Sequence, residues 1–350
     1  MAQMPVDIRD VAALAGVSVG SVSNVLNRPE RVSAPTRKRI EEAIVKLGYV
    51  RNGAARNLRA GSSRTLALTV FDLSNPFFAD VARGAEDVAL DAGYGMLLSN
   101  SRHSPARERS QLRMFEEYRV DAILLSPVDQ SNLDEVRRMR QRGTSVIFLE
   151  TTVPSHCSGS IDDVIGGRLA GAHLFGSGHR VVGFVGTPDR LHQCRDRRRG
   201  LVDAAEIAGL NPIRAVVDIE AATMSSHAGF DAVSSAIASD PPMTGIFCAN
   251  DLLALGALRA LIASGRRVPD DMALMGYDDI EFAGQSAIPL TSINQPSYEL
   301  GRSAAELAIS EINATSDHHH EEVRFIPTLV PRASTADAGA RVRRPSTRRR

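Results

Sequence analysis

Short apolar runs alternate with longer helical segments over most of the chain from residue 65 onward. The run TLALTVFD at 65–72 precedes PFFADVARGAEDVALDAG at 76–93, and TGIFCAN at 244–250 precedes DLLALGALRALIASG at 251–265. Repeated strand–helix units of this length are typical of parallel sheets that carry helices on both faces. The units form two series, so the sequence predicts an α/β fold with two similar lobes, each built on a doubly wound parallel sheet.

Polar side chains stand where several of these predicted strands end. In open parallel sheets, ligands bind beyond the carboxyl ends of the strands. We therefore expect a binding cleft close to the strand-exit residues, which are Asp72, Asn75, Phe78, Ser126, Glu150, Asn250 and Asp278.

The first fifty residues have a different pattern, with apolar side chains at helical spacing. Ile8, Val11, Ala12 and Ala15 indicate one helix, and Gly16 interrupts it. Ser18 is a suitable cap for a second helix, and Ser33 and Pro35 open a third that ends at Gly48. A helix, a turn with glycine and a short second helix predict a helix-turn-helix.

The second helix of this pattern has an outer face of small or polar residues. Asn reads adenine through two hydrogen bonds, and the apolar Val side chain contacts a thymine methyl group. The candidate DNA-binding residues are Ser18, Val19, Gly20, Ser21, Ser23, Asn24 and Asn27. The same three helices also fit a cap domain without a role in DNA binding, and this alternative stays open on the pattern alone.

The formal net charge is zero, but the charge is unevenly distributed. Residues 1–64 hold 11 Lys and Arg against 5 Asp and Glu, while residues 65–340 hold 24 against 36. The last ten residues, RVRRPSTRRR, add six arginines and no acid. A basic module on an acidic body predicts a polyanion partner for the module, although a solvated charged face is the plainer interpretation.

The segment DIRDVAALAGVSVGSVSNVLNRPERVSAPTRKRIEEAIVKLGYVRNGAARNLRAGSS at 7–63 closely resembles the N-terminal headpiece of LacI/GalR-family transcription regulators. The resemblance implies that a hinge helix follows the third helix and enters the minor groove beside its partner copy. It implies that Leu58 is a wedge between base pairs, with Ala55, Arg56 and Arg59 beside it on the DNA. The alternative for Leu58 is packing against the larger body of the protein.

The segments FDLSNPFFADVARGAED, FCANDLLALGALRAL and MALMGYDDIEFAGQSAIPLTSINQP resemble the core of the same family, which is similar to periplasmic sugar-binding proteins. The resemblance implies two lobes joined by three crossings, near residues 161–164, 291–295 and 325–330. It also implies that Arg197 grips oxygen atoms of an effector and that Asn250 and Asp278 bond its hydroxyl groups. Glu150 stands where the family often has an aspartate, which puts its role in doubt.

A polyhydroxylated ligand suits these side chains, so the expected effector is a sugar or related polyol. For each of these residues, Arg197 and Asp278 among them, the alternative is an ion pair between the lobes or the cap of a strand end. Whether the effector induces transcription or represses it is left open.

The predicted domains are a headpiece at 1–50, a hinge helix and linker at 51–63, an effector-binding and dimerisation core at 64–335 and a basic tail at 336–350. Within the core, lobe one comprises about 64–162 and 293–325, and lobe two about 163–292 and 326–335. We expect a homodimer, because a two-fold dimer reads both halves of a pseudo-palindromic operator.

Other sequence signals are weak. Cys157, Cys194 and Cys248 are few and far apart, which favours a reducing, cytoplasmic location over disulfides or a metal site. The HHH run at 318–320 is interpreted as a solvated loop, and neither a metal ion nor another cofactor is expected. Two other classes of protein are alternatives, a binding protein of a sugar transport system and an α/β enzyme. The headpiece argues against the first, and the lack of a nucleophile or cofactor motif against the second.

Overall fold

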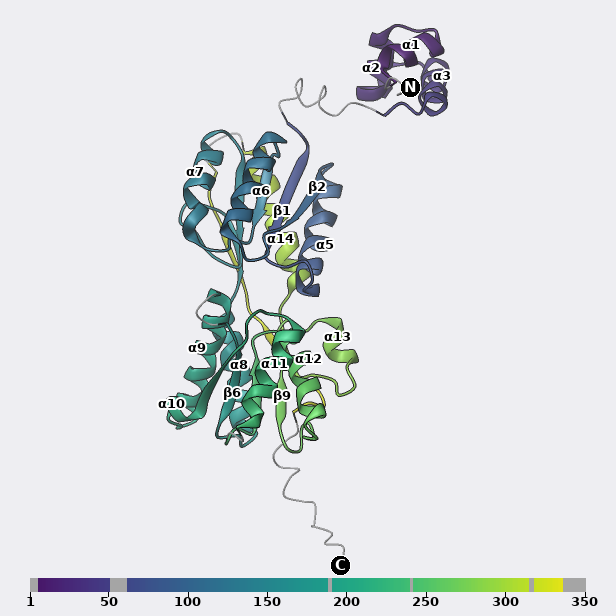
Figure 1. The fold of residues 1–350 in the computed structure, drawn as a ribbon. Coiled ribbons are helices and arrows are strands. Elements are labelled where there is room, and N and C mark those ends of the chain that lie inside the picture. Colours follow the sequence, from purple (N-terminus) through teal and green to yellow (C-terminus); the bar gives the residue numbers. More distant parts are fainter. Residues whose placement is uncertain (1–5, 51–61, 188–190, 240–241, 315–317, 336–350) are drawn as a thin grey trace, which may run out of the picture. The chain divides into compact units, whose positions relative to one another are not determined.

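The computed structural model describes residues 6–50, 62–187, 191–239, 242–314 and 318–335. The chain divides into two compact units, at residues 1–63 and 64–350, and Figure 1 colours them from purple to yellow along the sequence. Each unit has its own apolar core. No helix in the described ranges is long and apolar enough to cross a membrane.

The first unit contains three helices, α1 (Ile8–Ala15), α2 (Val19–Asn27) and α3 (Ala34–Leu47), with a 3-10 turn, η1, at Pro29–Arg31. Gly16 ends α1 with a left-handed φ of 63°, which favours glycine, so the chain turns sharply before α2. This arrangement confirms the predicted helix-turn-helix. Its buried apolar side chains are Val11, Ala12, Ala15, Val22, Val25, Ile40 and Ala43.

The second unit begins with lobe one, whose six-stranded sheet has the order β11-β5-β4-β3-β1-β2 with every pair parallel. Its elements in chain order are β1 (Thr65–Val70), α5 (Pro76–Asp91), β2 (Gly95–Asn100), α6 (Pro105–Glu117), β3 (Ala122–Leu125), η2 (Gln130–Asn132), α7 (Leu133–Gln141), β4 (Ser145–Leu149), β5 (Ser158–Ile161), α14 (Ser297–Asn313) and β11 (Glu322–Phe325).

Alternate side chains of these strands pack on opposite faces of the sheet. Leu66 and Leu68 of β1 belong to the cluster that includes α5 and α14, whereas Ala67 belongs to the cluster that includes α6 and α7. This two-residue alternation is what a strand buried on both faces requires.

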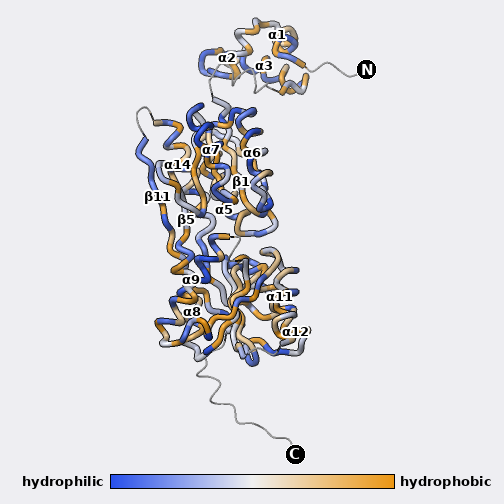
Figure 2. The backbone as a smooth tube through the Cα atoms, turned by 60° about the vertical axis from the view of Figure 1, so that its left-hand side comes forward, coloured by the Kyte–Doolittle hydropathy of each residue, from blue (hydrophilic) through white to orange (hydrophobic). Residues whose placement is uncertain are grey.

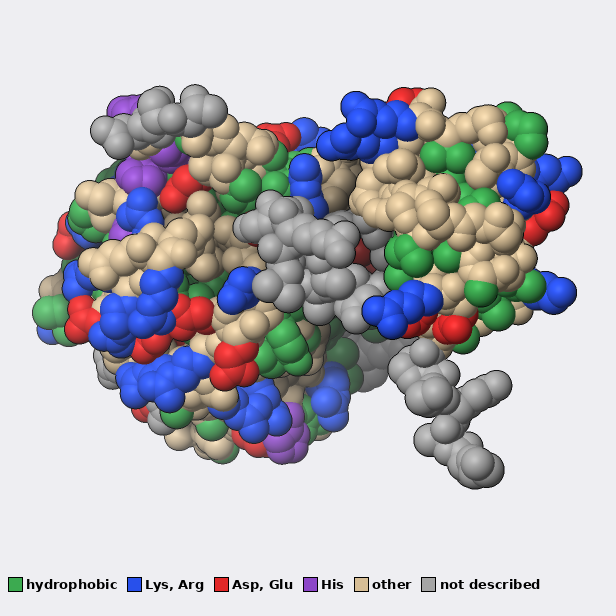
Figure 3. All heavy atoms as spheres, turned by 90° about the horizontal axis from the view of Figure 1, so that it is seen from above, with side chains coloured by type: hydrophobic (Ala, Val, Ile, Leu, Met, Phe, Trp, Pro, Cys, Tyr) green, Lys and Arg blue, Asp and Glu red, His purple; other side chains and the backbone are tan. Residues whose placement is uncertain are grey.

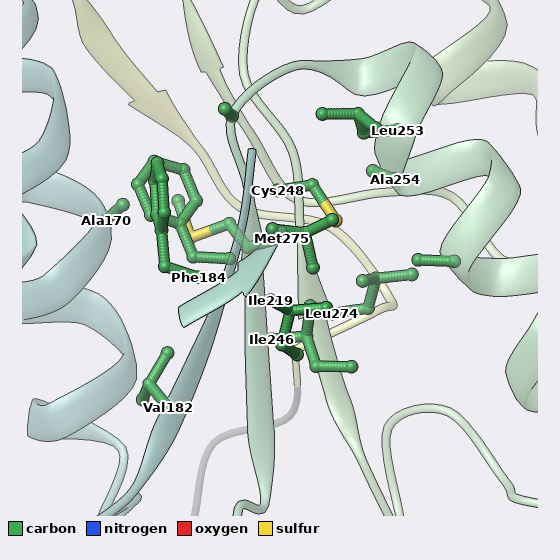
Figure 4. Close-up of a cluster of buried hydrophobic side chains, with 14 of the residues drawn as sticks. Ala170, Val182, Phe184, Ile219, Ile246, Cys248, Leu253, Ala254, Leu274 and Met275 are labelled. Carbon is green, nitrogen blue, oxygen red and sulfur yellow. The ribbon is translucent and has the colours of Figure 1, made fainter. Parts of the chain in front are cut away.

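Lobe two has a four-stranded parallel sheet in the order β7-β6-β8-β9. Its elements are α8 (Asp163–Gly176), β6 (Val182–Gly186), α9 (His192–Ile207), α10 (Pro212–Ala215), β7 (Val216–Glu220), α11 (Ser226–Ala238), β8 (Gly245–Cys248), α12 (Asp251–Ala263), β9 (Ala273–Met275) and α13 (Glu281–Gln285). Figure 4 shows Phe184 of β6, Ile246 of β8 and Leu274 of β9 in the apolar core between the sheet and its helices. The two parallel α/β lobes and the helical N-terminal unit confirm the predicted fold class.

Three crossings join the lobes. The first leads from β5 to α8, and the second from β10 (Ser292–Asn294) to α14. The third leads from β11 to β12 (Thr328–Val330), which pairs antiparallel with β10. In Figure 2, β11, β5 and α14 lie side by side at one edge of lobe one, which agrees with the pairing of β11 and β5.

Candidate functional site

The outer surface of α2 is the first candidate site. Ser18 caps the helix by accepting a hydrogen bond from the backbone N–H of Ser21 at 3.1 Å. Val19 is 42% exposed, and Gly20 and Asn24 are also exposed. Val22 and Val25 on the opposite face are buried against α1 and α3, so the packing orients the polar face outward.

Gly20 has open space around its Cα, because a Cβ there would meet only Ser18 Oγ, at 3.6 Å. Packing within the unit therefore does not require glycine at this position. The side-chain amide of Asn27 donates to the backbone oxygen of Ser23 at 2.8 Å and faces its hydroxyl at 3.2 Å. Of the predicted DNA-binding residues, Ser18, Val19, Gly20, Ser21, Ser23, Asn24 and Asn27 all lie on or next to α2.

The predicted hinge residues Ala55, Arg56, Leu58 and Arg59 lie outside the described residues, as does the basic tail at 336–350. Their roles stay predictions.

The second candidate site is a cavity between the two lobes of the core. Its enclosed volume is about 50 Å³, with further space toward its open mouth. Its walls include residues that follow β1, β4, β8 and β9, as expected for the carboxyl ends of parallel strands. The lining residues are Phe71, Asp72, Asn75, Phe77, Phe78, His103, Glu150, Leu191, Gln193, Cys194, Arg197, Met224, Asn250, Asp278 and Gln295.

The structure brings together seven of the eight predicted effector-binding residues. Ser126 is absent from the cavity wall, although its hydroxyl lies close enough to the Glu150 carboxyl to favour the ionised form. Asp72 uses part of its hydrogen-bonding capacity within its own turn. Its carboxylate accepts hydrogen bonds from the backbone N–H of Ser74 at 2.9 Å and from the Ser74 hydroxyl at 2.8 Å.

Asp278 links the two lobes. Its Oδ2 accepts a hydrogen bond from Asn75 Nδ2 of lobe one at 2.9 Å, and its Oδ1 accepts one from Gln295 Nε2 in the second crossing at 2.6 Å. Its φ of 104° is unusual for a residue with a side chain, and β9 ends three residues before it. Burial raises the pKa of this carboxyl to about 6, while Arg197 opposes the rise.

Arg197 is held within lobe two. Its Nε donates to Asp163 Oδ1 at 2.8 Å, and its Nη1 donates to the backbone oxygen of Ala249 at 2.6 Å. Its guanidinium carbon lies 3.8 Å from the centre of the Tyr277 ring. The backbone of Arg197 also abuts Gly167 of α8, where a Cβ would collide with the Arg197 carbonyl oxygen. Close packing of α8 on α9 therefore positions the guanidinium.

Arg197 also pairs with Asp278 at 3.7 Å, and both residues belong to lobe two. The ion pairs of Arg197 with Asp163 and Asp278 thus lie within one lobe, and Asp278 reaches lobe one through the hydrogen bond from Asn75. Asn250 caps the amino end of α12, since its Oδ1 accepts a hydrogen bond from the Leu253 N–H at 2.9 Å.

Glu150 follows β4 and is partly buried at the cavity wall, with its Oε2 atom enclosed. Burial, with the negative charge of Asp163 as the second cause, raises the pKa of its carboxyl to about 8. At neutral pH the group is therefore mainly protonated and offers a hydrogen-bond donor. Among the described residues, Glu150 Oε2, Ser126 Oγ and Gln193 Oε1 are buried without a hydrogen-bond partner.

One wall of the cavity is aromatic. The rings of Phe71 and Phe78 meet edge to face with centroids 5.8 Å apart, and Phe77 meets Phe78 in the same way at 5.0 Å. His103 stacks on Phe71 at 5.4 Å. An apolar face beside carboxyl, amide and guanidinium groups can bind a small molecule that has both an apolar ring face and hydroxyl groups.

Sequence reasoning missed several members of this wall. Phe71 and His103 follow β1 and β2, so the strand-exit rule applied to both. Gln193 and Cys194 lie one helical turn before Arg197, and Gln295 follows β10. No comparable sequence signal pointed to Leu191 or Met224.

Comparison with known proteins finds a match for each of the two units. Residues 7–52 match the family model for bacterial regulatory proteins of the lacI family, and residues 172–335 match the periplasmic binding protein-like domain. The chain is 32% identical over 335 residues to the HTH-type transcriptional repressor PurR of Photobacterium profundum. That alignment covers 94% of this chain and 98% of the repressor.

Solved structures are similar over most of the chain. The lac repressor dimer bound to operator and the anti-inducer ONPF has a TM-score of 0.81 at 26% identity and covers 95% of this chain and 99% of its own. A LacI family transcriptional regulator from Enterococcus faecium with bound ribose has a TM-score of 0.71 at 26% identity, covering 78% and 99%.

Proposed function

Because the chain belongs to the LacI family of bacterial regulatory proteins and is, with that family, a DNA-binding transcriptional regulator, we propose that it represses transcription as a homodimer on a pseudo-palindromic operator, controlled by a sugar or related polyol. The observation that carries the effector part of the proposal is the cavity between the lobes, where buried polar groups surround an aromatic wall. Asp278 and Asn75 join the lobes directly beside it.

The proposed effector is recognised from both lobes. Arg197 donates to its oxygen atoms, and the protonated Glu150 donates at neutral pH. The Phe78 ring lies against the apolar face of the sugar ring. The Enterococcus faecium regulator with bound ribose supports this class of ligand by similarity.

Thermal shift against pentoses, hexoses, polyols and nucleosides tests the proposed effector. We expect a sugar or polyol to raise the Tm of the wild type and of the control Arg198→Ala. Arg198 lies on the outside of α9, the helix that carries Arg197, and pairs with Asp218 of β7. Arg197→Ala and Asp278→Ala should lose the shift. An equal shift in all four proteins would mean that the ligand binds elsewhere. A response to nucleosides alone would mean that the effector is a nucleoside, with its flat base against the aromatic wall, and not a sugar.

The proposed dimer uses the edge of lobe one. β2 is the edge strand of the sheet, and it leaves Leu98 46% exposed, while Leu90 of the neighbouring α5 is 61% exposed. Exposed apolar side chains on an edge strand indicate an interaction surface. Sedimentation should give a dimer at micromolar concentration, and Leu98→Glu should shift it toward monomer. A monomeric wild type with full operator affinity would contradict the proposal.

On the operator, α2 is proposed to lie in the major groove, with Val19 and Asn24 at base edges. Replacing Asn24 with Ala should cost about 1–3 kcal/mol at one base pair and relax specificity there. Gel shift on a set of single-base operator variants measures this cost. Equal loss on every sequence would mean that Asn24 only contacts the backbone and that α2 is not the reading helix.

Leu58 is proposed to be a wedge in the minor groove, with Ala55, Arg56 and Arg59 around it. A segment of this length is too short to be a stable isolated helix, so we expect DNA to order it. Leu58→Gly should lose most operator affinity and the bend, while effector binding stays intact, since an apolar wedge kinks DNA by unstacking one step. Circularly permuted gel shift measures the bend. Wild-type bending by Leu58→Gly would contradict the wedge.

A further inference from the structure

Four metal-ligating side chains, here called the Cys157 cluster, meet in lobe one at the amino ends of the strands, whereas the cavity lies at their carboxyl ends. The cluster consists of Cys157, Glu311, His318 and His320. Cys157 directly precedes β5, Glu311 stands in the last turn of α14, and the two histidines precede β11. Because β5 and β11 are parallel, with Ser158 opposite Glu322, their amino ends lie together at the same edge of the sheet.

The donor atoms are close enough to share one ion. Cys157 Sγ lies 3.1 Å from His318 Nε2 and 3.6 Å from His320 Nδ1. His320 Nδ1 lies 3.9 Å from Glu311 Oε2, and all four donors lie within 4.8 Å of one another. Tetrahedral Zn²⁺ with ordinary bond lengths separates its donors by about 3.4–3.6 Å. To reach that geometry, the 3.1 Å contact of Cys157 with His318 lengthens slightly and the longer separations, up to 4.8 Å, shorten.

Hydrogen bonding explains only part of this arrangement. A thiol donating to His318 accounts for the shortest contact, but Glu311 Oε2 is buried without a hydrogen-bond partner among the described residues. A carboxylate oxygen in that state is costly unless something compensates its charge. The Arg140 guanidinium lies 3.7 Å from the other oxygen, Oε1, whereas Oε2 faces His320 Nδ1 at 3.9 Å, where a bound cation would compensate it.

The groups around the cluster support the ligands. Arg140 Nη1 donates to the backbone oxygen of Ser155 at 2.7 Å, and its Nη2 lies 3.7 Å from Glu311 Oε1. The His156 ring stacks on His320 with centroids 6.4 Å apart. Arg140 Nη2 also lies 3.0 Å from His320 Nε2. Metal binding at Nδ1 leaves a proton on Nε2, so both nitrogen atoms would then be donors. The guanidinium therefore has to turn toward Glu311 when the metal binds.

The sequence alone suggested a solvated histidine run. His319 is indeed exposed, but His318 and His320 are half-buried, so that interpretation is wrong for these two residues. Histidine side chains gather at the upper left of Figure 3, on the surface of the molecule. A metal ion can therefore reach the cluster from solvent.

We propose that Cys157, Glu311, His318 and His320 form a tetrahedral Zn²⁺ site. One thiolate, two imidazoles and one carboxylate suit Zn²⁺ and exclude Mg²⁺ and Ca²⁺, which prefer oxygen ligands alone. Binding displaces the thiol proton of Cys157, so affinity rises with pH. The ion joins β5, α14 and β11, the three lobe-one segments that lead to or from the crossings.

Metal content of the full chain, purified without a histidine tag, tests the site. We expect one Zn²⁺ per chain, and Co²⁺ in its place should show the charge-transfer band of a Co²⁺–thiolate bond. Cys157→Ser should lose the band and weaken Zn²⁺ binding by more than about 100-fold, because changes to groups that merely hold the ligands already cost 10- to 100-fold. His318→Ala should weaken Zn²⁺ binding by a similar factor.

His319→Ala is the matched control, since His319 is the exposed neighbour outside the cluster. It should bind Zn²⁺ like the wild type, and a chelator should lower the Tm of both. A chelator should leave the Tm of Cys157→Ser unchanged. This Tm should equal that of the metal-free wild type, and such a result would show that the variant folds. Absence of the thiolate band, or equal Zn²⁺ affinity in Cys157→Ser and the wild type, would overturn the site.

Discussion

The polar groups that line the cavity differ between the two lobes in how fully they are hydrogen-bonded to the protein. In lobe two, Arg197 and Asn250 are already hydrogen-bonded to protein atoms. In lobe one, Glu150 Oε2 and Ser126 Oγ are buried near each other without a hydrogen bond of regular geometry among the described residues, and Gln193 Oε1 of lobe two is also without a partner. The difference indicates that lobe two is organised before a ligand arrives, whereas lobe one keeps hydrogen-bonding capacity for it.

The largest expected effect comes from breaking the network of lobe two. Arg197→Ala leaves the buried Asp163 and Asp278 without their cation, so the free energy of unfolding should fall by about 3–5 kcal/mol. Urea denaturation measures it. Arg198→Ala on the outside of α9 is the matched control and should cost about 0–1 kcal/mol. Similar costs for both variants would mean that Arg197 does not organise lobe two.

A smaller effect is expected from the bond between the lobes. Asn75→Ala removes the donor to Asp278 and the cap of α5, so it should cost about 1–3 kcal/mol. Asn75→Ser retains a capping hydroxyl but is too short to reach Asp278, so it isolates the contact between the lobes. Small-angle scattering should show a larger radius of gyration for both variants. An unchanged radius would mean that other contacts hold the lobes together.

At Glu150 we expect a change in stability that is smallest at low pH and grows as the pH rises. Its pKa is raised to about 8 in the folded protein, so the folded state binds more protons than the unfolded state between about pH 4.5 and pH 8. The stability of the wild type therefore falls through this range as pH rises, relative to Glu150→Gln. Thermal melts of both proteins at about pH 5 and about pH 9 measure the difference. A constant difference in Tm would contradict the raised pKa.

Short-range patterns accounted for the first unit and for the sheet architecture. Gly16 and Ser18 predicted the turn and the cap of α2 because each acts on neighbours within three or four residues. The alternation of apolar runs predicted parallel strands, and the strand-exit rule led to Asn75, Glu150 and Asp278. It failed for Ser126, which follows β3 and lies near Glu150 but is not on the cavity wall, because the rule gives the edge of a sheet and not the depth of a side chain.

The sequence by itself determined the helix-turn-helix, the two α/β lobes and the edge of the sheets at which the cavity lies, since each depends on periodicity, caps and the direction of neighbouring strands. Only the tertiary structure decided which distant side chains meet there. Asn75 bonds Asp278 across 203 positions, and Cys157 meets His318 across 161. Both contacts depend on strand order and on the lobe to which each crossing leads. No local pattern encodes that order, because it follows from packing the whole sheet.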